Sequence, residues 1–389
     1  MPVEANGRRY NEPRIRSAVV CLDGVDPAYV DDAFSRGMTP HLRELTYLLG
    51  RSQLPSFTNP NNMSIVTGVP ASVHGLPGNH YLDEAGAEVQ LDRPEQLRAE
   101  SIHAAFHRAG ASVLAVTTKE KLRRLLGAGG VPCVSAERAS AQAVPGVDGV
   151  AADAVDRPPP GIYDWDCSHY ALELGLALGD RLGVELLYVS LTDFVQHAAA
   201  PGEELSDRYL VLLDDLVGRY LAAGWRLALV ADHGMNAKPH VRYLGDVLED
   251  AGVHTARVVL PITDPYVVHH AALGSCCWVH VAPADAAAAQ AALEGVDGVE
   301  EVIERERAAR ELSLPADRIG DLVVLADAET ALGGKALEHD LSALRGALRS
   351  HGGRHEQTVP IFLSHPPGWP PATPTNADVH ALLLGEVTA

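Results

Sequence analysis

Short apolar runs of strand length, separated by segments with helical periodicity, are the feature that most limits how this chain can fold. The strand-like runs lie at residues 17–22, 112–116, 184–190, 226–231 and 360–364, and the helix-like segments at residues 40–49, 169–182 and 206–222. Strands that alternate with helices favour a mostly parallel sheet with helices on both faces. We therefore predict an α/β fold whose functional side chains gather just beyond the carboxyl ends of the strands.

The alternation breaks between residues 263 and 327. Here two apolar runs, "GSCCWVHVA" and "DLVVLAD", flank the alanine-rich segment "DAAAAQAALEG". This pattern predicts a small α+β insertion at residues 263–327 that lies over the sheet as a cap. The main domain is then expected to comprise residues 1–262 and 328–389, which is long enough for one large core.

Composition limits the partners of the chain. Asp and Glu number 51 and Lys and Arg number 31, so the formal net charge of −20 argues against nucleic acid or an anionic membrane. The sequence shows neither a membrane-spanning apolar window nor a signal peptide. Five cysteines without a pairing framework are typical of reduced thiols, which predicts a cytoplasmic protein. The oligomeric state stays open, a homodimer included.

Metal-ligating residue types follow several of the strand-like runs. They are Asp23, the pair Asp193 and His197, and the pair Asp232 and His233; His351, in "LRSHGGRHEQ", instead precedes the run at residues 360–364. Each piece alone is more typical of a turn, a helix cap or a solvated surface. Together they supply three carboxylates and three imidazoles, a set that suits Zn²⁺ and is compatible with Mn²⁺ or Fe²⁺.

The stretch "PSFTNPNNMSIVTG" at residues 55–68 places Thr58 among turn-forming residues before an apolar run. Asn59 and Pro60 are typical of a helix N-cap and the first helical position. Thr58 would then lie beside a helix amino end, where free N–H groups and the helix dipole favour anions. These residues alone leave two alternatives, a helix cap or a nucleophile that attacks a phosphate-like group.

Several segments together resemble the alkaline phosphatase superfamily, in its nucleotide pyrophosphatase/phosphodiesterase-like branch. They are "CLDGVDP", "PSFTNPNNMSIVTGVPASVHGLPGNHYLD", "TDFVQH", "ADHG" and "RSHGGRHEQTVPIF", in the order that the family shows. The resemblance covers most of the chain outside the expected cap. It implies an alkaline phosphatase-like core that binds two zinc ions.

The resemblance also assigns roles to individual residues. The implied ligands form two sets: Asp23, Asp232, His233 and Thr58 for one ion, and Asp193, His197 and His351 for the other. Thr58 takes the place of the family's nucleophile, which favours catalysis over a cap. Asn79, in "HGLPGNHY", matches an asparagine that donates to a phosphoryl oxygen.

Two of the four lysines in the chain, Lys119 and Lys121, lie in "SVLAVTTKEKLRRLLG", where Thr117 and Thr118 are expected to cap a helix. Cations are unfavourable in a first helical turn, although two solvated surface lysines remain the simpler alternative. The segment, with "CVSAERA" after it, resembles the phosphonoacetate hydrolases within that superfamily. The resemblance implies that both lysines bind the carboxylate of the small anionic substrate phosphonoacetate.

The expected activity is therefore metal-dependent hydrolysis of the carbon–phosphorus bond of phosphonoacetate, through a phosphothreonine intermediate. Expulsion of a carbanion requires that its charge spread onto the carboxylate, which the two ammonium groups would stabilise. One alternative is a nucleotide pyrophosphatase or phosphodiesterase on the same scaffold. Another is a metal-dependent protein that binds phosphoanions without turnover.

Overall fold

The computed structural model describes residues 2–386, except residues 162, 263–271, 345 and 369–370. Its larger part is a seven-stranded sheet with the order β4-β19-β10-β3-β9-β7-β8. The strands are β3 (Ser17–Cys21), β4 (Thr46–Arg51), β7 (Val113–Thr117), β8 (Cys133–Ser135), β9 (Leu186–Ser190), β10 (Arg226–Val230) and β19 (Thr358–Leu363). Strands β10, β3, β9, β7 and β8 run parallel, and β19 is antiparallel to both of its neighbours. The mostly parallel sheet that the alternation predicts is confirmed.

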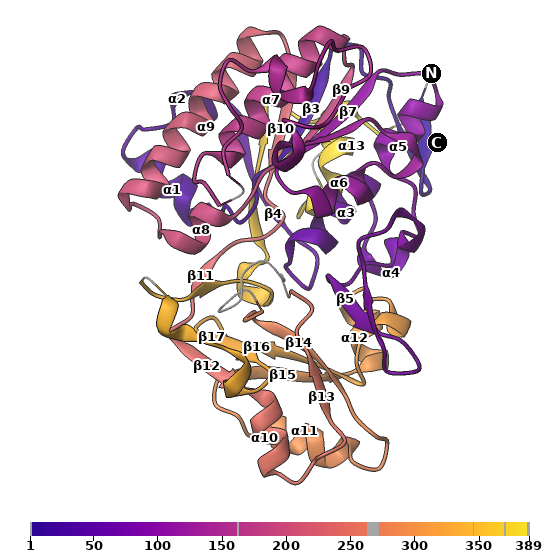
Figure 1. Ribbon diagram of the computed structural model, residues 1–389, viewed down its shortest axis with the longest axis vertical. Coiled ribbons are helices and arrows are strands. Elements are labelled where there is room, and N and C mark those ends of the chain that lie inside the picture. Colours follow the sequence, from indigo (N-terminus) through magenta and orange to yellow (C-terminus); the bar gives the residue numbers. More distant parts are fainter. Residues whose placement is uncertain (1, 162, 263–271, 345, 369–370, 387–389) are drawn as a thin grey trace.

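Helices cover both faces of this sheet (Figure 1). Helices α1 (Pro27–Ser35), α2 (Pro40–Arg43), α7 (Cys167–Leu182) and α9 (Glu204–Ala222) pack on one face, and α3 (Thr58–Thr67), α5 (Ile102–Arg108), α6 (Glu120–Leu126) and α13 (Val379–Leu384) on the other. The alternation of side chains along each strand explains this arrangement. In β3, for example, Val20 belongs to the first core and Val19 to the second.

The helix predicted for residues 40–49 is wrong beyond its first turn. Helix α2 ends at Arg43, and β4 begins at Thr46 and pairs along its whole length with β19. Tyr47 packs against the first core and Leu48 against the second, as adjacent residues of a strand do. The leucines of this segment also match a helical spacing, which is why periodicity alone misassigned it.

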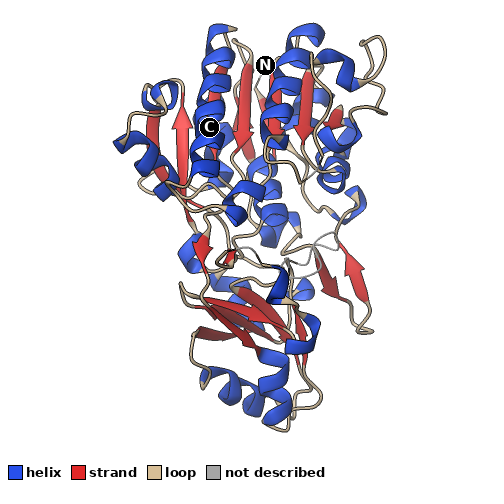
Figure 2. Cartoon of the chain, turned by 60° about the vertical axis from the view of Figure 1, so that its left-hand side comes forward, coloured by secondary structure: helices blue, strands red, loops and turns tan. Residues whose placement is uncertain are grey.

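A smaller lobe lies at the carboxyl ends of the main strands (Figure 2). It contains the antiparallel sheet β13-β14-β16-β15 and the parallel pair β12-β17. Its elements are β12 (His240–Tyr243), α10 (Leu244–Asp250), β13 (Arg257–Val259), β14 (Cys276–His280), α11 (Ala286–Glu294), β15 (Val299–Glu304), α12 (Arg305–Glu311), β16 (Leu322–Ala326) and β17 (Thr330–Gly333). We call this lobe the cap.

The boundaries of the insertion at residues 263 and 327 stay a prediction. Within the described residues, the cap sheet already uses β13, which precedes residue 263, and β17 follows residue 327. The first part of the predicted insertion, residues 263–271, lies outside the described residues.

Several short strands and α-helices lie outside the elements named so far. They are β1 (Val3–Ala5), β2 (Arg8–Tyr10), α4 (Ala71–His74), β5 (His80–Leu82), β6 (Glu88–Gln90), α8 (Phe194–Ala198), β11 (Asn236–Ala237) and β18 (Arg349–Ser350). All five cysteines are buried and free of disulfides. Among the described residues, no helix combines the length and the apolar character that crossing a membrane requires.

Candidate active site

Three acidic residues lie immediately beyond neighbouring parallel strands of the main sheet. Asp23 follows β3, Asp193 follows β9 and Asp232 follows β10. Because the strands are parallel and adjacent, their carboxyl ends bring these side chains to one edge of the sheet. The structure thereby places together residues that are more than 200 positions apart in the sequence.

The first group of candidate metal ligands consists of Asp23, Asp232 and His233, which we call the Asp23 cluster. One potential ligand atom of each lies within 4.8 Å of the others, and all three side chains are buried. His233 Nε2 is 3.3 Å from Asp23 Oδ1 and 3.8 Å from Asp232 Oδ2. This set of two carboxylates and one imidazole suits a divalent cation.

The second group consists of Asp193, His197 and His351, which we call the Asp193 cluster. Helix α8 begins directly after Asp193, so His197 stands one turn later on the same face, with Nε2 3.0 Å from Asp193 Oδ2. His351 arrives from the loop after β18, and its Nε2 is 3.6 Å from the same oxygen. The rings of His351 and His233 stack at 3.6 Å between centroids, so the two clusters are neighbours.

All three histidines present the same ring nitrogen to the clusters. Nδ1 of His197, His233 and His351 lies 2.8–2.9 Å from the backbone carbonyl oxygens of Arg349, Gly234 and Ser56, respectively. A carbonyl only accepts, so each Nδ1 carries the proton and donates it. Each Nε2 is then left with its lone pair toward the cluster, which is the arrangement that metal-ligating histidines need.

The electrostatics of the site favour cations. Burial and the neighbouring carboxylates of Asp193 and Asp232 raise the pKa of Asp23 to about 8, and burial with Asp193 raises the pKa of Asp232 to about 7. Asp23 Oδ2 is buried and has no hydrogen-bond partner. Divalent ions would satisfy this oxygen and offset the repulsion, so the residues fit two metal ions. The structure does not identify the metal.

These raised pKa values lead to a prediction about metal uptake. A carboxyl group with a raised pKa keeps its proton below that pKa, so Asp23 is largely protonated at pH 7 in the metal-free protein. A ligand must lose its proton to bind, so zinc uptake at pH 7 should release protons, and fewer should be released at pH 9. Titration calorimetry in buffers of different ionisation enthalpy measures this number. Equal proton release at both pH values would contradict the prediction, and Asp23→Asn should release fewer protons at pH 7.

Thr58 is the first residue of α3, and its hydroxyl faces the Asp23 cluster. Its Oγ1 lies 3.3 Å from Asp23 Oδ1 and 3.2 Å from His233 Nε2. The prediction that Asn59 caps this helix is wrong, because the N-cap is Phe57 and the Asn59 amide instead donates to Asn79 Oδ1 at 2.7 Å. Thr58 therefore combines an uncapped helix amino end with two candidate metal ligands.

Asn79 is held between the core and the cap side of the structure. Its side chain accepts from Asn59 and donates to the carbonyl oxygen of Ile262 at 3.1 Å, and its backbone N–H donates to the Pro261 carbonyl at 2.7 Å. The structure thus links Asn79 to the start of α3, beside the predicted nucleophile, through the side chain of Asn59, the residue after Thr58.

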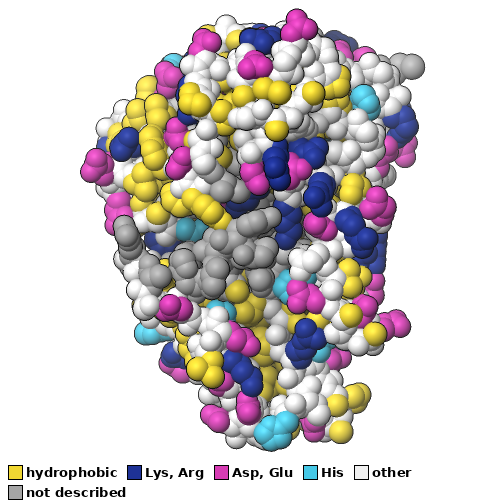
Figure 3. Space-filling model, viewed as in Figure 1, with side chains coloured by type: hydrophobic (Ala, Val, Ile, Leu, Met, Phe, Trp, Pro, Cys, Tyr) yellow, Lys and Arg dark blue, Asp and Glu magenta, His cyan; other side chains and the backbone are white. Residues whose placement is uncertain are grey.

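Lys119 and Lys121 stand at the start of α6, beyond the end of β7. The Nζ of Lys119 is 4.0 Å from Asp193 Oδ1. Burial is the main cause that lowers the pKa of His80; the charge of Glu88 opposes it, and the positive charge of Lys121 adds to the lowering. The predicted cap is wrong, because Lys119 itself is the N-cap and Thr117 belongs to β7. Figure 3 shows Lys and Arg side chains concentrated over the region that Figure 1 labels α6. In an acidic protein, this region is locally positive.

Sequence reasoning missed residues that hold the ligands in place. Asn62 donates to Asp232 Oδ2 at 3.2 Å and accepts from the hydroxyl of Tyr188 at 2.8 Å. Asn62 lies four residues after Thr58 on α3, so helical spacing could have placed both on one face. Arg349 donates to the carbonyl oxygens of Gln196 and Met235, next to the two ligand segments. No local pattern marks an arginine for such a role.

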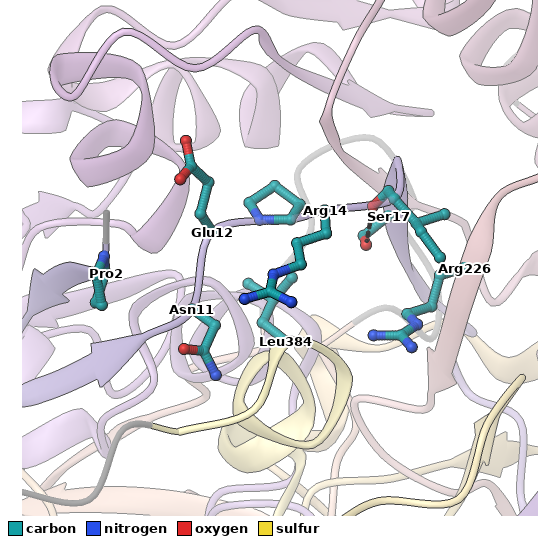
Figure 4. Close-up of a pocket in the computed structure, with 9 residues that line it drawn as sticks. Pro2, Asn11, Glu12, Arg14, Ser17, Arg226 and Leu384 are labelled. Carbon is teal, nitrogen blue, oxygen red and sulfur yellow. Dashed lines mark hydrogen bonds between the residues drawn. The ribbon is translucent and has the colours of Figure 1, made fainter.

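A surface cavity of the structure belongs to the opposite end of the sheet. Arg14 and Arg226 line it with Glu12 and Leu384, as Figure 4 shows. Arg226 is the first residue of β10, whereas Asp232 follows the last, so the cavity lies at the amino ends of the strands. It is therefore separate from the candidate active site.

This fold and two neighbouring metal-ligand clusters define a hydrolase of the alkaline phosphatase type. The family model of type I phosphodiesterase / nucleotide pyrophosphatase matches residues 17–355, so the chain belongs to this family. Within it, the chain is a homologue of phosphonoacetate hydrolase. The crystal structures of that enzyme from Sinorhizobium meliloti 1021, in complex with phosphonoacetate and with phosphonoformate, are 39% identical to it, with a TM-score of 0.93 and 99% of both chains covered.

The same fold also occurs in a protein of much lower sequence identity. Murine ectonucleotide pyrophosphatase / phosphodiesterase 5 has a TM-score of 0.64 at 16% identity, with 95% of this chain and 94% of that chain covered. At this identity the likeness concerns the fold alone. The resemblance inferred from the sequence motifs, both to the superfamily and to phosphonoacetate hydrolases, is confirmed.

Proposed function

We propose that this protein hydrolyses the carbon–phosphorus bond of phosphonoacetate, releasing acetate and phosphate. The observation that carries the proposal is the position of the Thr58 hydroxyl, within 3.3 Å of both Asp23 and His233. The homologue bound to phosphonoacetate, 39% identical over the whole chain, supports the choice of substrate. The positive charge of Lys119, beside the Asp193 cluster, also supports this choice, because the substrate carries a negative carboxylate.

The two clusters would hold the metal ions, which we expect to be zinc, with manganese or iron as alternatives. The Asp23 cluster with Thr58 would hold one ion, and the Asp193 cluster the other. When bound, two divalent ions would lower the pKa of the threonine hydroxyl and offset the charge of the phosphoryl oxygens. Asn79 would donate a hydrogen bond to one of these oxygens.

The chemistry of the chain's own residues follows from this placement. Thr58 Oγ1 gives its proton to water and forms a bond to phosphorus, while the phosphorus–carbon bond breaks and its electron pair passes to the acetate carbon. Lys119 and Lys121 stabilise the charge that spreads onto the carboxylate, and the carbon takes a proton from water to give acetate. Water then hydrolyses the phosphothreonine, which restores Thr58 and releases phosphate.

One assay tests the proposal directly. We expect phosphate release from phosphonoacetate above the rate without enzyme, lost on chelation and restored by Zn²⁺. The same preparation is compared on an aryl phosphodiester. Faster turnover of the diester would favour a nucleotide pyrophosphatase or phosphodiesterase instead. Binding of phosphonoacetate without release of phosphate would favour the non-catalytic phosphoanion-binding protein.

Removal of a single distant ligand is expected to empty one metal position. His351 reaches Asp193 only through the fold, so His351→Ala should lower the zinc content from about two ions per chain towards one and greatly reduce the rate. Metal analysis after gel filtration measures the content. His355→Ala is a matched control, because His355 lies in the same loop region but pairs with Glu300 on the surface. Two tightly held zinc ions in His351→Ala would remove His351 from the site.

A further inference from the structure

A lysine and a glutamate form an ion pair that is completely buried between the core and the cap. Lys238 Nζ lies 2.8 Å from Glu356 Oε1, and the exposed fraction of both side chains is 0%. Lys238 is one of only four lysines in the chain, and the other three are at least partly exposed. Burial of both charges costs desolvation free energy, so a gain in stability alone does not explain why the pair is here.

Glu356 contacts the segments that carry ligands of both clusters. Its backbone carbonyl accepts from the N–H of Gly234, the residue after His233, at 2.7 Å. Its Oε2 accepts from the N–H of Gly353, two residues after His351, at 3.0 Å. Glu356 thus holds the chain one residue after a ligand of the Asp23 cluster and two residues after a ligand of the Asp193 cluster.

Lys238 extends this connection to the cap. Its Nζ also donates to the carbonyl oxygen of Ala328, in the loop after β16, at 2.9 Å, and its backbone N–H donates to the Leu348 carbonyl at 2.7 Å. From the cap side, the N–H of Ser275 donates to the carbonyl oxygen of His351 at 2.9 Å. The loop with His351 is therefore held on one side by Glu356 and on the other by the cap.

Neighbouring side chains pack closely against the two glycines that Glu356 contacts. A Cβ added at Gly353 would lie 2.9 Å from the Cβ of Ser275, and one added at Gly234 would lie 2.5 Å from Asp26 Oδ2. Both distances are shorter than real Cβ contacts, so a side chain at either glycine would displace its neighbour, the Cβ of Ser275 or the end of the Asp26 side chain. Asn236 Nδ2 completes the environment of Glu356 Oε1 at 2.8 Å, so the buried carboxylate is fully hydrogen-bonded.

We propose that the Lys238–Glu356 pair is a positioning element that holds His351 against His233, and so sets the separation of the two metal positions. The inference rests on the proposed function, because it requires that the two clusters bind metal. Neither residue touches the clusters directly; both act through the backbone of the loops that carry the ligands. The link to Ala328 makes the cap part of the same arrangement.

The test separates positioning from stability. Lys238→Met leaves the buried charge of Glu356 without its charged partner, so this variant should have a lower Tm and a lower affinity for the second zinc ion. The double variant Lys238→Met with Glu356→Leu removes both charges and should recover much of the Tm. The double variant also removes the hydrogen bond to Gly353. Its affinity for the second zinc ion should therefore stay about 10- to 100-fold lower than that of wild type, as for other residues that orient metal ligands. Competition with a chelator measures zinc affinity, and Tm is measured on the same samples.

Controls make each outcome decisive. Lys335→Met alters an exposed lysine that pairs with Glu249 on the cap surface, and it should change neither quantity. Wild-type affinity for both zinc ions in the double variant overturns the positioning role, whereas failure of the wild type to bind two zinc ions overturns the proposed function itself. If the double variant does not fold, Glu356→Gln tests the same point, because the amide keeps the size of the side chain but removes the charge that bonds both Lys238 and Gly353. Unchanged affinity for the second zinc ion in that variant also overturns the inference.

Discussion

Replacement of Thr58 by alanine is expected to abolish turnover of phosphonoacetate and to leave the fold intact. If Thr58 is the nucleophile, its loss should lower kcat by about 10⁴-fold or more, as for other enzymes that act through a covalent intermediate. The Thr58 side chain does not cap α3, so the variant should not show the loss of about 1 kcal/mol that is typical of removing a cap. Phosphate release and thermal unfolding measure the two effects.

Two further measurements make the Thr58 result specific. Thr58→Ser keeps a hydroxyl at the same position and should retain a measurable rate, whereas Thr67→Ala, at the other end of α3, should keep the full rate. Wild-type protein quenched in acid during turnover should carry phosphate on Thr58, which mass spectrometry detects. If the alanine variant retains most of its rate, the covalent mechanism is wrong.

The parts of the site that the sequence predicts best are those where a local rule carries the information. Asp23, Asp193 and Asp232 each lie within three residues of the end of an apolar run, and parallel strands place their carboxyl ends at one edge of the sheet. Helical spacing brings His197 to the same face as Asp193. These residues depend on short segments whose structure is set by their own periodicity.

The errors arise where tertiary contacts override local preference. Residues 46–49 belong to the segment predicted as a helix but form part of β4 and pair with β19, because an edge strand gains a full ladder of hydrogen bonds there. Asn59 is a favourable N-cap by type, yet its amide donates to Asn79, a residue 20 positions away. In both cases a partner distant in sequence decides the outcome.

Placement of His351 and of the residues that support the ligands also depends on distant partners. His351 enters the site because Ser56 accepts from its Nδ1 and Ser275 donates to its carbonyl. The motif around His351 carries a resemblance to the family, but no sequence periodicity connects His351 to Asp193. The pair Lys238 and Glu356 is separated by 118 positions and carries no local signature.

Replacement of both Lys119 and Lys121 by alanine is expected to separate recognition of the substrate's carboxylate from chemistry at phosphorus. The metal ligands, Thr58 and Asn79 are assigned to the phosphoryl end, and the lysines to the carboxylate. Their loss should raise KM and lower kcat for phosphonoacetate, because the same charge stabilises the bound substrate and the departing enediolate. We expect kcat/KM to fall by about 10²- to 10⁴-fold, in line with removal of donors aimed at developing charge.

The contrast with a second substrate decides whether this loss is specific. An aryl phosphate or phosphonate ester has no carboxylate and a stable leaving group, so its turnover should fall much less in the double variant, or even rise. The informative quantity is the ratio of kcat/KM for the two substrates, measured in wild type, in the double variant and in Lys335→Ala as the exposed-lysine control. Lys119 also lies 4.0 Å from Asp193 Oδ1. If the lysines act only through their charge at the metal cluster, their loss should lower kcat/KM for both substrates by the same factor. An equal fall for both would therefore leave phosphonoacetate without its main physical support as the substrate.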